Sequence, residues 1–239
     1  MKLQLIDFDN LSKTLTLCIY IMCHTNNEEA KIKFIKYVNE KYNSKNILDI
    51  LENISNIINA NILQVTEYNY EPYGASVNIL TSDSQFNNKD ICAHLDKSHI
   101  SVHTYPDINY NTNVSSLRID LEISTCGRIS PLNALEKIVD YFNPDILIGD
   151  FKIRGFTRDT RGKRIYSSQD YKKVVNKFKK GQLGKYHILK SGKNYYNEIQ
   201  IKMMKRKEFF RDCLERKTLN NINMFEQLYK EAKKIYLRR

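Results

Sequence analysis

The clearest alternation of apolar and polar residues runs over 114–124, where Leu117, Ile119, Leu121 and Ile123 share one face of a predicted strand. Similar patterns predict strands over 14–24, 61–69, 75–81 and 145–153. Residues 91–105 read as extended chain with an interruption at Asp96–Ser98. The polar stretches 82–90 and 106–113 are expected to be loops.

Apolar residues at helical spacing predict two helices within 28–59, separated at Asn43 and Ser44, with Ser44 as the cap of the second. Ser130 and Pro131 are typical of a cap and first position, so a third helix is expected to begin there. The resulting order is β-α-β-β-β-β-α-β. With antiparallel neighbours and helices on one face, it predicts an α+β fold, a two-layer sandwich with a mainly antiparallel sheet.

The remainder of the chain, beyond about residue 160, is expected to be a basic and mostly helical extension, with a weak strand signal at 186–190. No apolar run approaches the ~18–20 residues that a membrane span needs, so a transmembrane protein is not expected.

Charge is unevenly distributed in this chain of 239 residues, whose formal net charge is +11. Residues 1–150 contain 12 Lys and Arg against 19 Asp and Glu, whereas the other 89 residues contain 26 against 8. A basic half suits a polyanion, but it also neutralises an acidic half within the chain or across a subunit contact. The second interpretation is favoured, and nucleic acid is not expected as a partner, because no base-reading motif accompanies the charge.

The cysteines form an odd and scattered set without CxxC pairs, which is typical of neither a disulfide framework nor a zinc site. Asp7 and Asp9 interrupt the apolar character of the N-terminus and argue against a secretory signal. A cytoplasmic location is therefore expected, with reduced thiols. The five residues are Cys18, Cys23, Cys92, Cys126 and Cys213.

Candidate chemistry is concentrated in residues 93–103, where three histidines and two serines occur in strand-like chain. A serine hydroxyl near a histidine base suits nucleophilic chemistry. Ser98 and His103 are five residues apart, so a regular strand directs them to opposite faces unless the chain bends near Ser98. By composition alone they are ordinary strand residues, and common hydrolase, zinc-protease, kinase and dinucleotide motifs are missing.

Three ordered segments change this interpretation: Pro72–Ser76, Lys97–Pro106 and Ser124–Gly127. Together they resemble the prokaryotic S-adenosylmethionine decarboxylase proenzymes. The segment Arg154–Asp159 is similar to the longer, enterobacterial-type branch in particular. The resemblance covers residues 1–160 as a catalytic core, and it leaves the extension, 161–239, without an assigned role.

The resemblance implies an enzyme that builds its own cofactor by cutting itself between Lys97 and Ser98. The Ser98 hydroxyl attacks the Lys97 carbonyl to give an ester, and β-elimination and hydrolysis leave a pyruvoyl group at position 98. The products are a β chain, 1–97, and an α chain, 98–239. The pyruvoyl ketone binds the substrate amine as a Schiff base and accepts electrons as CO2 departs, so no separate organic cofactor is required.

Family roles then fall on particular positions. Ser76 corresponds to the processing serine, His103 to the processing base and Cys126 to the proton donor for the substrate. Tyr70 corresponds to an aromatic residue that stacks on adenine. Asp107 corresponds to the carboxylate that holds the ribose, although relatives usually have the longer Glu.

The implied reaction converts S-adenosylmethionine to S-adenosylmethioninamine and CO2, which supplies aminopropyl groups for spermidine. Two alternatives stay open: a pyruvoyl-dependent arginine or ornithine decarboxylase, and a non-catalytic polyanion-binding homologue. Retention of Ser98, His103 and Cys126 disfavours the second. A homo-oligomer of αβ units is expected. The longer branch is associated with activation by Mg²⁺, but the sequence shows no ligand cluster for that ion.

Overall fold

The computed structural model describes residues 5–9, 11–83, 98–126, 129–159, 161–165, 184–191, 198–214 and 222–237. The expected cleavage site is therefore described from Ser98 onward, while Lys97 and most of the predicted 82–90 loop lie outside the described residues.

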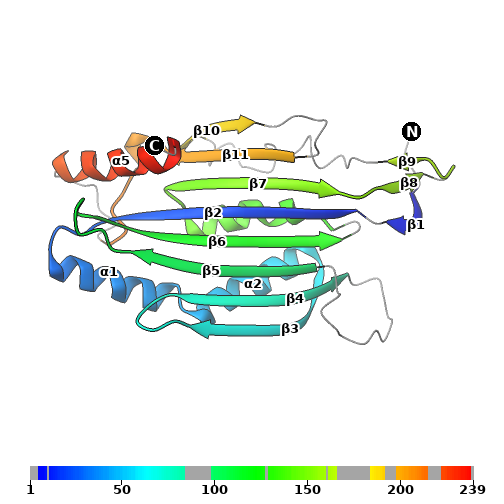
Figure 1. Ribbon diagram of the computed structural model, residues 1–239, viewed down its shortest axis with the longest axis horizontal. Coiled ribbons are helices and arrows are strands. Elements are labelled where there is room, and N and C mark those ends of the chain that lie inside the picture. The colour runs from blue at the N-terminus through cyan, green and yellow to red at the C-terminus, as the bar shows by residue number, and fades with distance from the viewer. Residues whose placement is uncertain are drawn as a thin grey trace.

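An eight-stranded sheet forms the centre of the molecule, and every neighbouring pair of its strands is antiparallel (Figure 1). In spatial order its strands are β10 (Tyr186–Ser191), β11 (Glu198–Lys205), β7 (Ile146–Arg154), β2 (Ser12–His24), β6 (Val114–Cys126), β5 (Ser98–Asp107), β4 (Ala75–Asp83) and β3 (Ala60–Asn69). A small second sheet lies beyond the start of β2 and contains β1 (Leu5–Asp9), β8 (Thr157–Asp159) and β9 (Arg164–Ile165).

The main core lies between one face of the sheet and three helices, α1 (Glu28–Lys41), α2 (Ser44–Ile58) and α3 (Leu135–Phe142). Strand β6 shows why the sheet forms there, because its four alternating apolar side chains, at 117, 119, 121 and 123, are all buried in this core. The α+β fold class with a mainly antiparallel sheet is confirmed.

The opposite face of the sheet has a smaller core at one end, under helix α5 (Ile222–Leu237). There Leu228, Ala232 and Tyr236 pack with Met22 and Ile148. Elsewhere this face presents alternate, mostly half-exposed side chains of β2, β5 and β6. We call it the open face, and it is the face on which most of the predicted site residues lie.

Two predicted caps differ from the structure. Asn43, rather than Ser44, caps α2, because the Asn43 side-chain oxygen accepts a hydrogen bond from the Asn46 backbone N–H at 2.9 Å. Ser130 precedes a 3-10 turn, η1 (Pro131–Ala134), that continues into α3, and its hydroxyl makes no capping bond.

The basic extension is less helical than expected among its described residues. The weak strand signal at 186–190 is confirmed as β10, and a further strand, β11, pairs with β7 before the short η5 (Lys207–Phe209) and α5. The alternation of Ile199, Ile201 and Met203 buries one side of β11 in the main core. Core and extension therefore share one sheet.

One cysteine prediction is wrong. Cys23 and Cys213 form a disulfide with their Cα atoms 5.1 Å apart, so these two residues are not reduced thiols. Their separation of 190 positions concealed the pair in the sequence, and the fold brings them together at the end of β2. As for membranes, no helix in the described part of the chain has the length and apolar character to span one.

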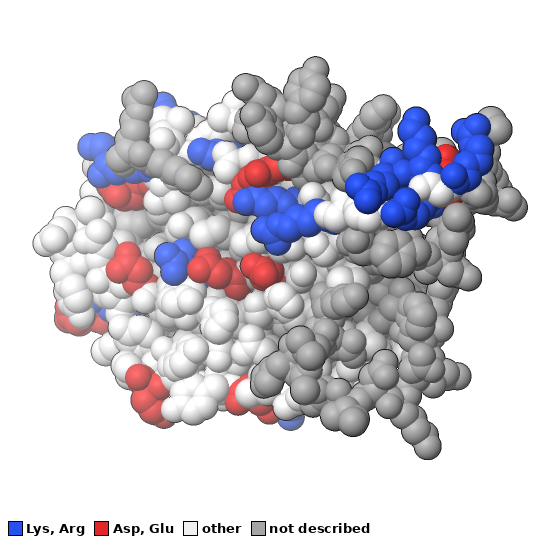
Figure 2. All heavy atoms as spheres, turned by 45° about the vertical axis from the view of Figure 1, so that its right-hand side comes forward, with Lys and Arg blue, Asp and Glu red and all other residues white. Residues whose placement is uncertain are grey.

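Part of the positive charge of the second half gathers on the hairpin of β8 and β9 (Figure 2). The guanidinium groups of Arg158 and Arg164 lie 5.3 and 5.0 Å from the centre of the Phe156 ring. The buried Asp159 carboxylate accepts hydrogen bonds from the backbone of Arg161 and Lys163. Asp159 therefore builds the turn of a hairpin whose outer surface is basic.

Candidate active site

Ser98 and Cys126 meet at one end of the sheet, where β5 begins and β6 ends. The Ser98 side chain is only 4% exposed, and its hydroxyl oxygen accepts a hydrogen bond from the backbone N–H of Cys126 at 3.2 Å. The two residues belong to different motifs and are 28 positions apart in the sequence. The sheet thus places the motif cysteine beside the motif serine.

The side chain of Ser98 lies on the helix-covered side of the sheet. Burial alternates along β5, so Ser98, Ile100 and Val102 face the main core and the intervening residues face the other way. Thr81 of β4 is the direct partner of Ser98 in the register. The Thr81 hydroxyl is buried and has no hydrogen-bond partner within the described ranges. Nothing in the sequence singled out this threonine.

Ser76 and His103 also meet, but in the middle of β5 and on the open face. They are direct partners in the β4–β5 register. Directly opposite residues of antiparallel strands share a face and have Cβ atoms about 4.5–5.5 Å apart. The register continues in both directions, which gives a row across five strands that we call the central row: Tyr68, Ser76, His103, Asp120 and Cys18.

Asp120 contacts the polar side chains next to it in and beside this row. Its carboxylate accepts a hydrogen bond from the Cys18 thiol at 3.1 Å and lies 3.4 Å from the Arg118 guanidinium. Burial raises the pKa of the Cys18 thiol to about 11, so the thiol stays protonated at neutral pH and donates the hydrogen bond to Asp120. Burial likewise raises the pKa of Tyr20, beside Cys18, to about 12. Sequence reasoning missed Asp120 and Cys18 because only the strand register places them with His103.

The structure does not bring Ser98 and His103 together. Strand β5 is continuous from Ser98, so five residues at ~3.4 Å each separate the two by roughly 17 Å. Their side chains also lie on opposite faces. The bend near Ser98 that would make them converge is not formed in this conformation.

The predicted substrate residues lie nearer to the central row than to Ser98. Tyr70 follows β3, is 39% exposed, and has its ring centre 5.3 Å from that of Tyr68. Its backbone N–H donates to the Gly74 carbonyl across a turn in which Gly74 has a φ of 103°. Asp107 is the exposed last residue of β5, roughly 30 Å along the strand from Ser98.

No magnesium site is found among the described residues. The group there that offers three possible metal ligands is Cys23, Asp212 and Cys213, and two of its members form the disulfide. Magnesium prefers oxygen ligands in octahedral geometry, so this group does not suit it.

Comparison with known proteins supplies the family. Residues 35–154 match the family model for S-adenosylmethionine decarboxylase. An S-adenosylmethionine decarboxylase proenzyme of Clostridium perfringens is 37% identical over 221 residues, which cover 85% of this chain and 82% of that protein. The proenzyme of Photorhabdus laumondii is 35% identical over 254 aligned positions, with 98% and 96% coverage.

A solved structure is also similar to this chain. The crystal structure of the adenosylmethionine decarboxylase from Aquifex aeolicus has 17% identity and a TM-score of 0.38, and the match covers 62% of this chain and 91% of that one. The sequence matches cover most of both partners, from the first strands to the extension. The chain therefore belongs to the S-adenosylmethionine decarboxylase family.

Proposed function

We propose that this protein is a proenzyme that cuts itself between Lys97 and Ser98 and then decarboxylates S-adenosylmethionine. Family membership supports the reaction class. The observation that carries the assignment of residues is the hydrogen bond between the Cys126 backbone and the Ser98 hydroxyl, because the backbone of the expected proton donor contacts the serine to be converted.

The surroundings of Ser98 fit the formation of a pyruvoyl group. A buried hydroxyl held by a backbone N–H is fixed in orientation before it attacks the preceding carbonyl, which lowers the entropic part of the barrier. Once formed, the pyruvoyl group supplies an electron sink for loss of CO2 from an amino acid. Cys126 lies at the same end of the sheet, on the open face by the alternation of β6, so it can return a proton to the substrate α-carbon once the first residues of β5 have left the sheet.

The roles proposed for Ser76 and His103 require a movement. The pair occupies the open face, whereas the Ser98 side chain faces the main core. His103 can therefore take the α-proton of Ser98 only if the first residues of β5 leave the sheet. We propose that this happens during processing, when the ester relieves the constraint of the amide bond.

We assign substrate recognition to the end of the central row that contains Tyr68, with Tyr70 beside it. Tyr68 and Tyr70 present two adjacent, exposed rings, which suit both stacking on adenine and attraction of a sulfonium cation. Arginine and ornithine have neither group. With S-adenosylmethionine as substrate, the product supplies aminopropyl groups for spermidine. We propose that αβ units assemble as a homo-oligomer in the cytoplasm.

Mass spectrometry of the purified protein under reducing conditions tests the cleavage. We expect two chains, 1–97 and 98–239, with the larger lacking an amino terminus, and a single chain for Ser98→Ala. Release of CO2 from carboxyl-labelled S-adenosylmethionine, arginine and ornithine then tests the substrate. An active protein with an intact Ser98 would disprove the pyruvoyl mechanism, and CO2 from arginine or ornithine alone would reassign the substrate.

A further inference from the structure

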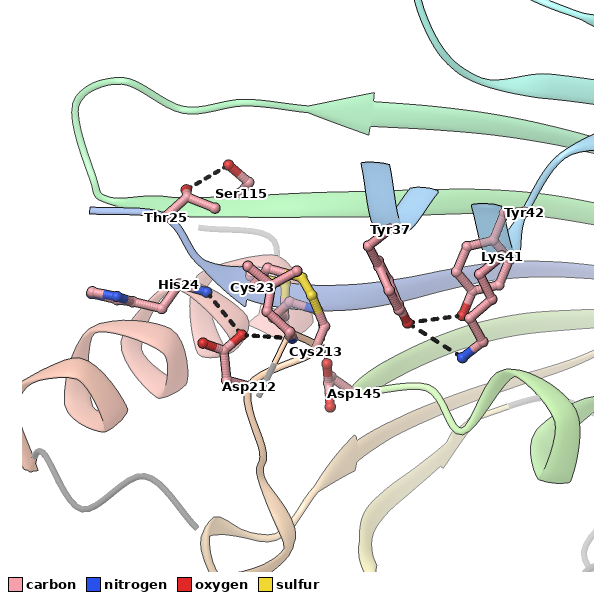
Figure 3. The surroundings of a disulfide bond; sticks show 12 residues. Cys23, His24, Thr25, Tyr37, Lys41, Tyr42, Ser115, Asp145, Asp212 and Cys213 are labelled. Carbon is pink, nitrogen blue, oxygen red and sulfur yellow. Dashed lines mark hydrogen bonds between the residues drawn. A yellow bond between two sulfur atoms is a disulfide. The ribbon is translucent and has the colours of Figure 1, made fainter. Parts of the chain in front are cut away.

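The disulfide between Cys23 and Cys213 joins two distant parts of the fold (Figure 3). Cys23 is the penultimate residue of β2 and is fully buried in the main core. Cys213 lies in the turn that follows β11 and η5, and it packs against the same core. Their Cα separation of 5.1 Å is within the range of ordinary disulfides.

The position of this bond relative to the proposed cleavage site gives it a consequence for the mature enzyme. Cys23 belongs to segment 1–97, and Cys213 belongs to segment 98–239. We propose that the disulfide is a covalent bond between the β and α chains of the mature protein. This inference rests on the proposed self-cleavage, since an uncut chain would contain the same bond as an internal one.

The fold holds Cys213 at this place by more than the bond itself. The buried Asp212 carboxylate accepts hydrogen bonds from the backbone N–H groups of His24, at 3.3 Å, and Leu214, at 3.2 Å (Figure 3). Phe210, three residues before Cys213, is fully buried in the core under α5. The two sulfur atoms are therefore adjacent in the folded chain, and folding of the precursor sets the pairing before cleavage.

Formation of the bond needs an oxidant, for which we propose a low-molecular-weight disulfide of the glutathione type. One cysteine thiolate attacks that disulfide, forms a mixed disulfide and releases one small thiol. The second cysteine thiolate then displaces the other small thiol and closes the Cys23–Cys213 bond. The protein loses two electrons and two protons, and the small disulfide gains them as two thiols. In a reducing cytoplasm the reverse exchange opens the bond. Whether the two chains are covalently linked therefore depends on the ratio of small thiols to small disulfides around the protein.

A metal ion held by the same residues is the competing interpretation. The Asp212 carboxylate lies within 4.8 Å of both sulfur atoms. A structural zinc site uses four ligands, however, and this group supplies three. One Asp212 oxygen already accepts two backbone N–H groups, which suits a carboxylate that anchors a turn.

Gel electrophoresis of the full-length protein, quenched with N-ethylmaleimide, tests the interchain bond. Without reductant we expect one species of about 28 kDa, and with reductant two chains. Cys213→Ser should give two chains in both lanes. Cys23→Ser should also give two chains in both lanes. If this change at a buried position prevents folding, Cys213→Ser, at a half-buried position, still tests the bond. Thr16→Ser, an exposed position of β2 outside the central row, is the control that keeps both cysteines, and it should keep the wild-type pattern.

The other possible gel patterns distinguish a missing interchain bond from a failure of the cleavage itself. Two chains in both lanes for the wild type, with full modification of both thiols or with bound zinc, would overturn the interchain bond and leave the proposed function intact. One chain in both lanes would show that cleavage fails, and it would overturn both. A second measurement applies to the cleaved protein. Its melting temperature should fall more steeply on dilution after reduction than before, because reduction adds dissociation of the two chains to the dissociation of the αβ units.

Discussion

At the scale of residues, the predicted site divides into two groups at two places along one sheet. Ser98 and Cys126 share a hydrogen bond at one end of the sheet, while Ser76 and His103 pair in the central row. In the proposed mechanism these groups act at different stages. The first group contains the atoms of the future cofactor and its proton donor, and the second belongs to processing. Single substitutions therefore separate maturation from turnover.

Cys126→Ala is expected to mature at least in part and then to decarboxylate S-adenosylmethionine about 10²–10⁴-fold more slowly, which is the usual effect of losing a general acid. A time course with mass analysis of the α chain measures both steps. Protonation at the wrong carbon should also convert the pyruvoyl group slowly to alanine. Ser124→Ala, on the same strand and face, is the control and should behave like the wild type. Wild-type turnover with a lasting pyruvoyl group would exclude Cys126 as the donor.

His103→Ala is expected to stop processing at the ester, because Ser98 keeps its hydroxyl but elimination lacks its base. Hydroxylamine, which cleaves esters, should then cut the variant at Ser98, and mass spectrometry would show the new end. His99→Ala is the matched control: His99 lies on the same strand and face, is exposed and hydrogen-bonded to Glu122 at 3.1 Å, and its loss should leave maturation normal. If His103→Ala forms pyruvoyl at the wild-type rate, the base lies elsewhere, as the roughly 17 Å separation from Ser98 would then explain.

At the scale of elements, periodicity was sufficient to predict most of the sheet. Apolar and polar residues alternate along β6 because one face of the strand is buried and the other is not. A hydrophobic period of two residues indicates this kind of strand. Strand β11 was missed because its lysines, the half-exposed Lys202 and the buried Lys205, added to a basic composition that suggested a solvated helix. Composition identified the basic charge of the extension but not that its apolar residues alternate.

The grouping of site residues depended on register, which periodicity does not contain. A shift of one residue between β4 and β5 would move Ser76 to the other face from His103. Family motifs identified Ser98, His103 and Cys126, yet Thr81, Asp120 and Cys18 carry no motif and became visible only as cross-strand partners. The disulfide was hidden for a related reason, since its two residues meet only after the strands and the extension have assembled.

Asp145 is expected to be the most sensitive charged residue of the junction between β2, β7 and β11. It accepts hydrogen bonds from the Lys205 ammonium and the Met22 backbone, both at 2.8 Å, and both members of the ion pair are buried. Asp145→Ala leaves the Lys205 charge without its carboxylate, so the free energy of unfolding should fall by about 3–5 kcal/mol. Urea titration measures this.

The control for that change is Asp150→Ala on the neighbouring strand β7. Asp150 is half-exposed and accepts a hydrogen bond from the Gln200 side chain at 3.0 Å, so its loss should cost less than about 1 kcal/mol. Equal effects of the two substitutions would mean that burial of the Asp145–Lys205 pair does not control the stability of this junction.

At the scale of the whole molecule, the proposed cut divides the sheet into interlaced parts. Segment 1–97 contributes β2, β3 and β4, and segment 98–239 contributes β5, β6, β7, β10 and β11. Strand β2 lies between β6 and β7 and is hydrogen-bonded to both along most of its length, while β4 pairs with β5 (Figure 1). The two chains cannot separate without breaking a central strand out of the sheet and exposing both sides of the main core.

The mature protein should therefore remain a single particle under native conditions even when its disulfide is reduced. Size-exclusion chromatography in reductant is expected to give one peak that contains both chains, at the same elution volume as the uncut Ser98→Ala precursor. In urea with reductant, the chains should separate, because the burial that holds β2 in place is then lost. A free β chain in native, reducing buffer would contradict the interlaced assembly, since it would require β2 to leave its position between two α-chain strands without unfolding of the rest.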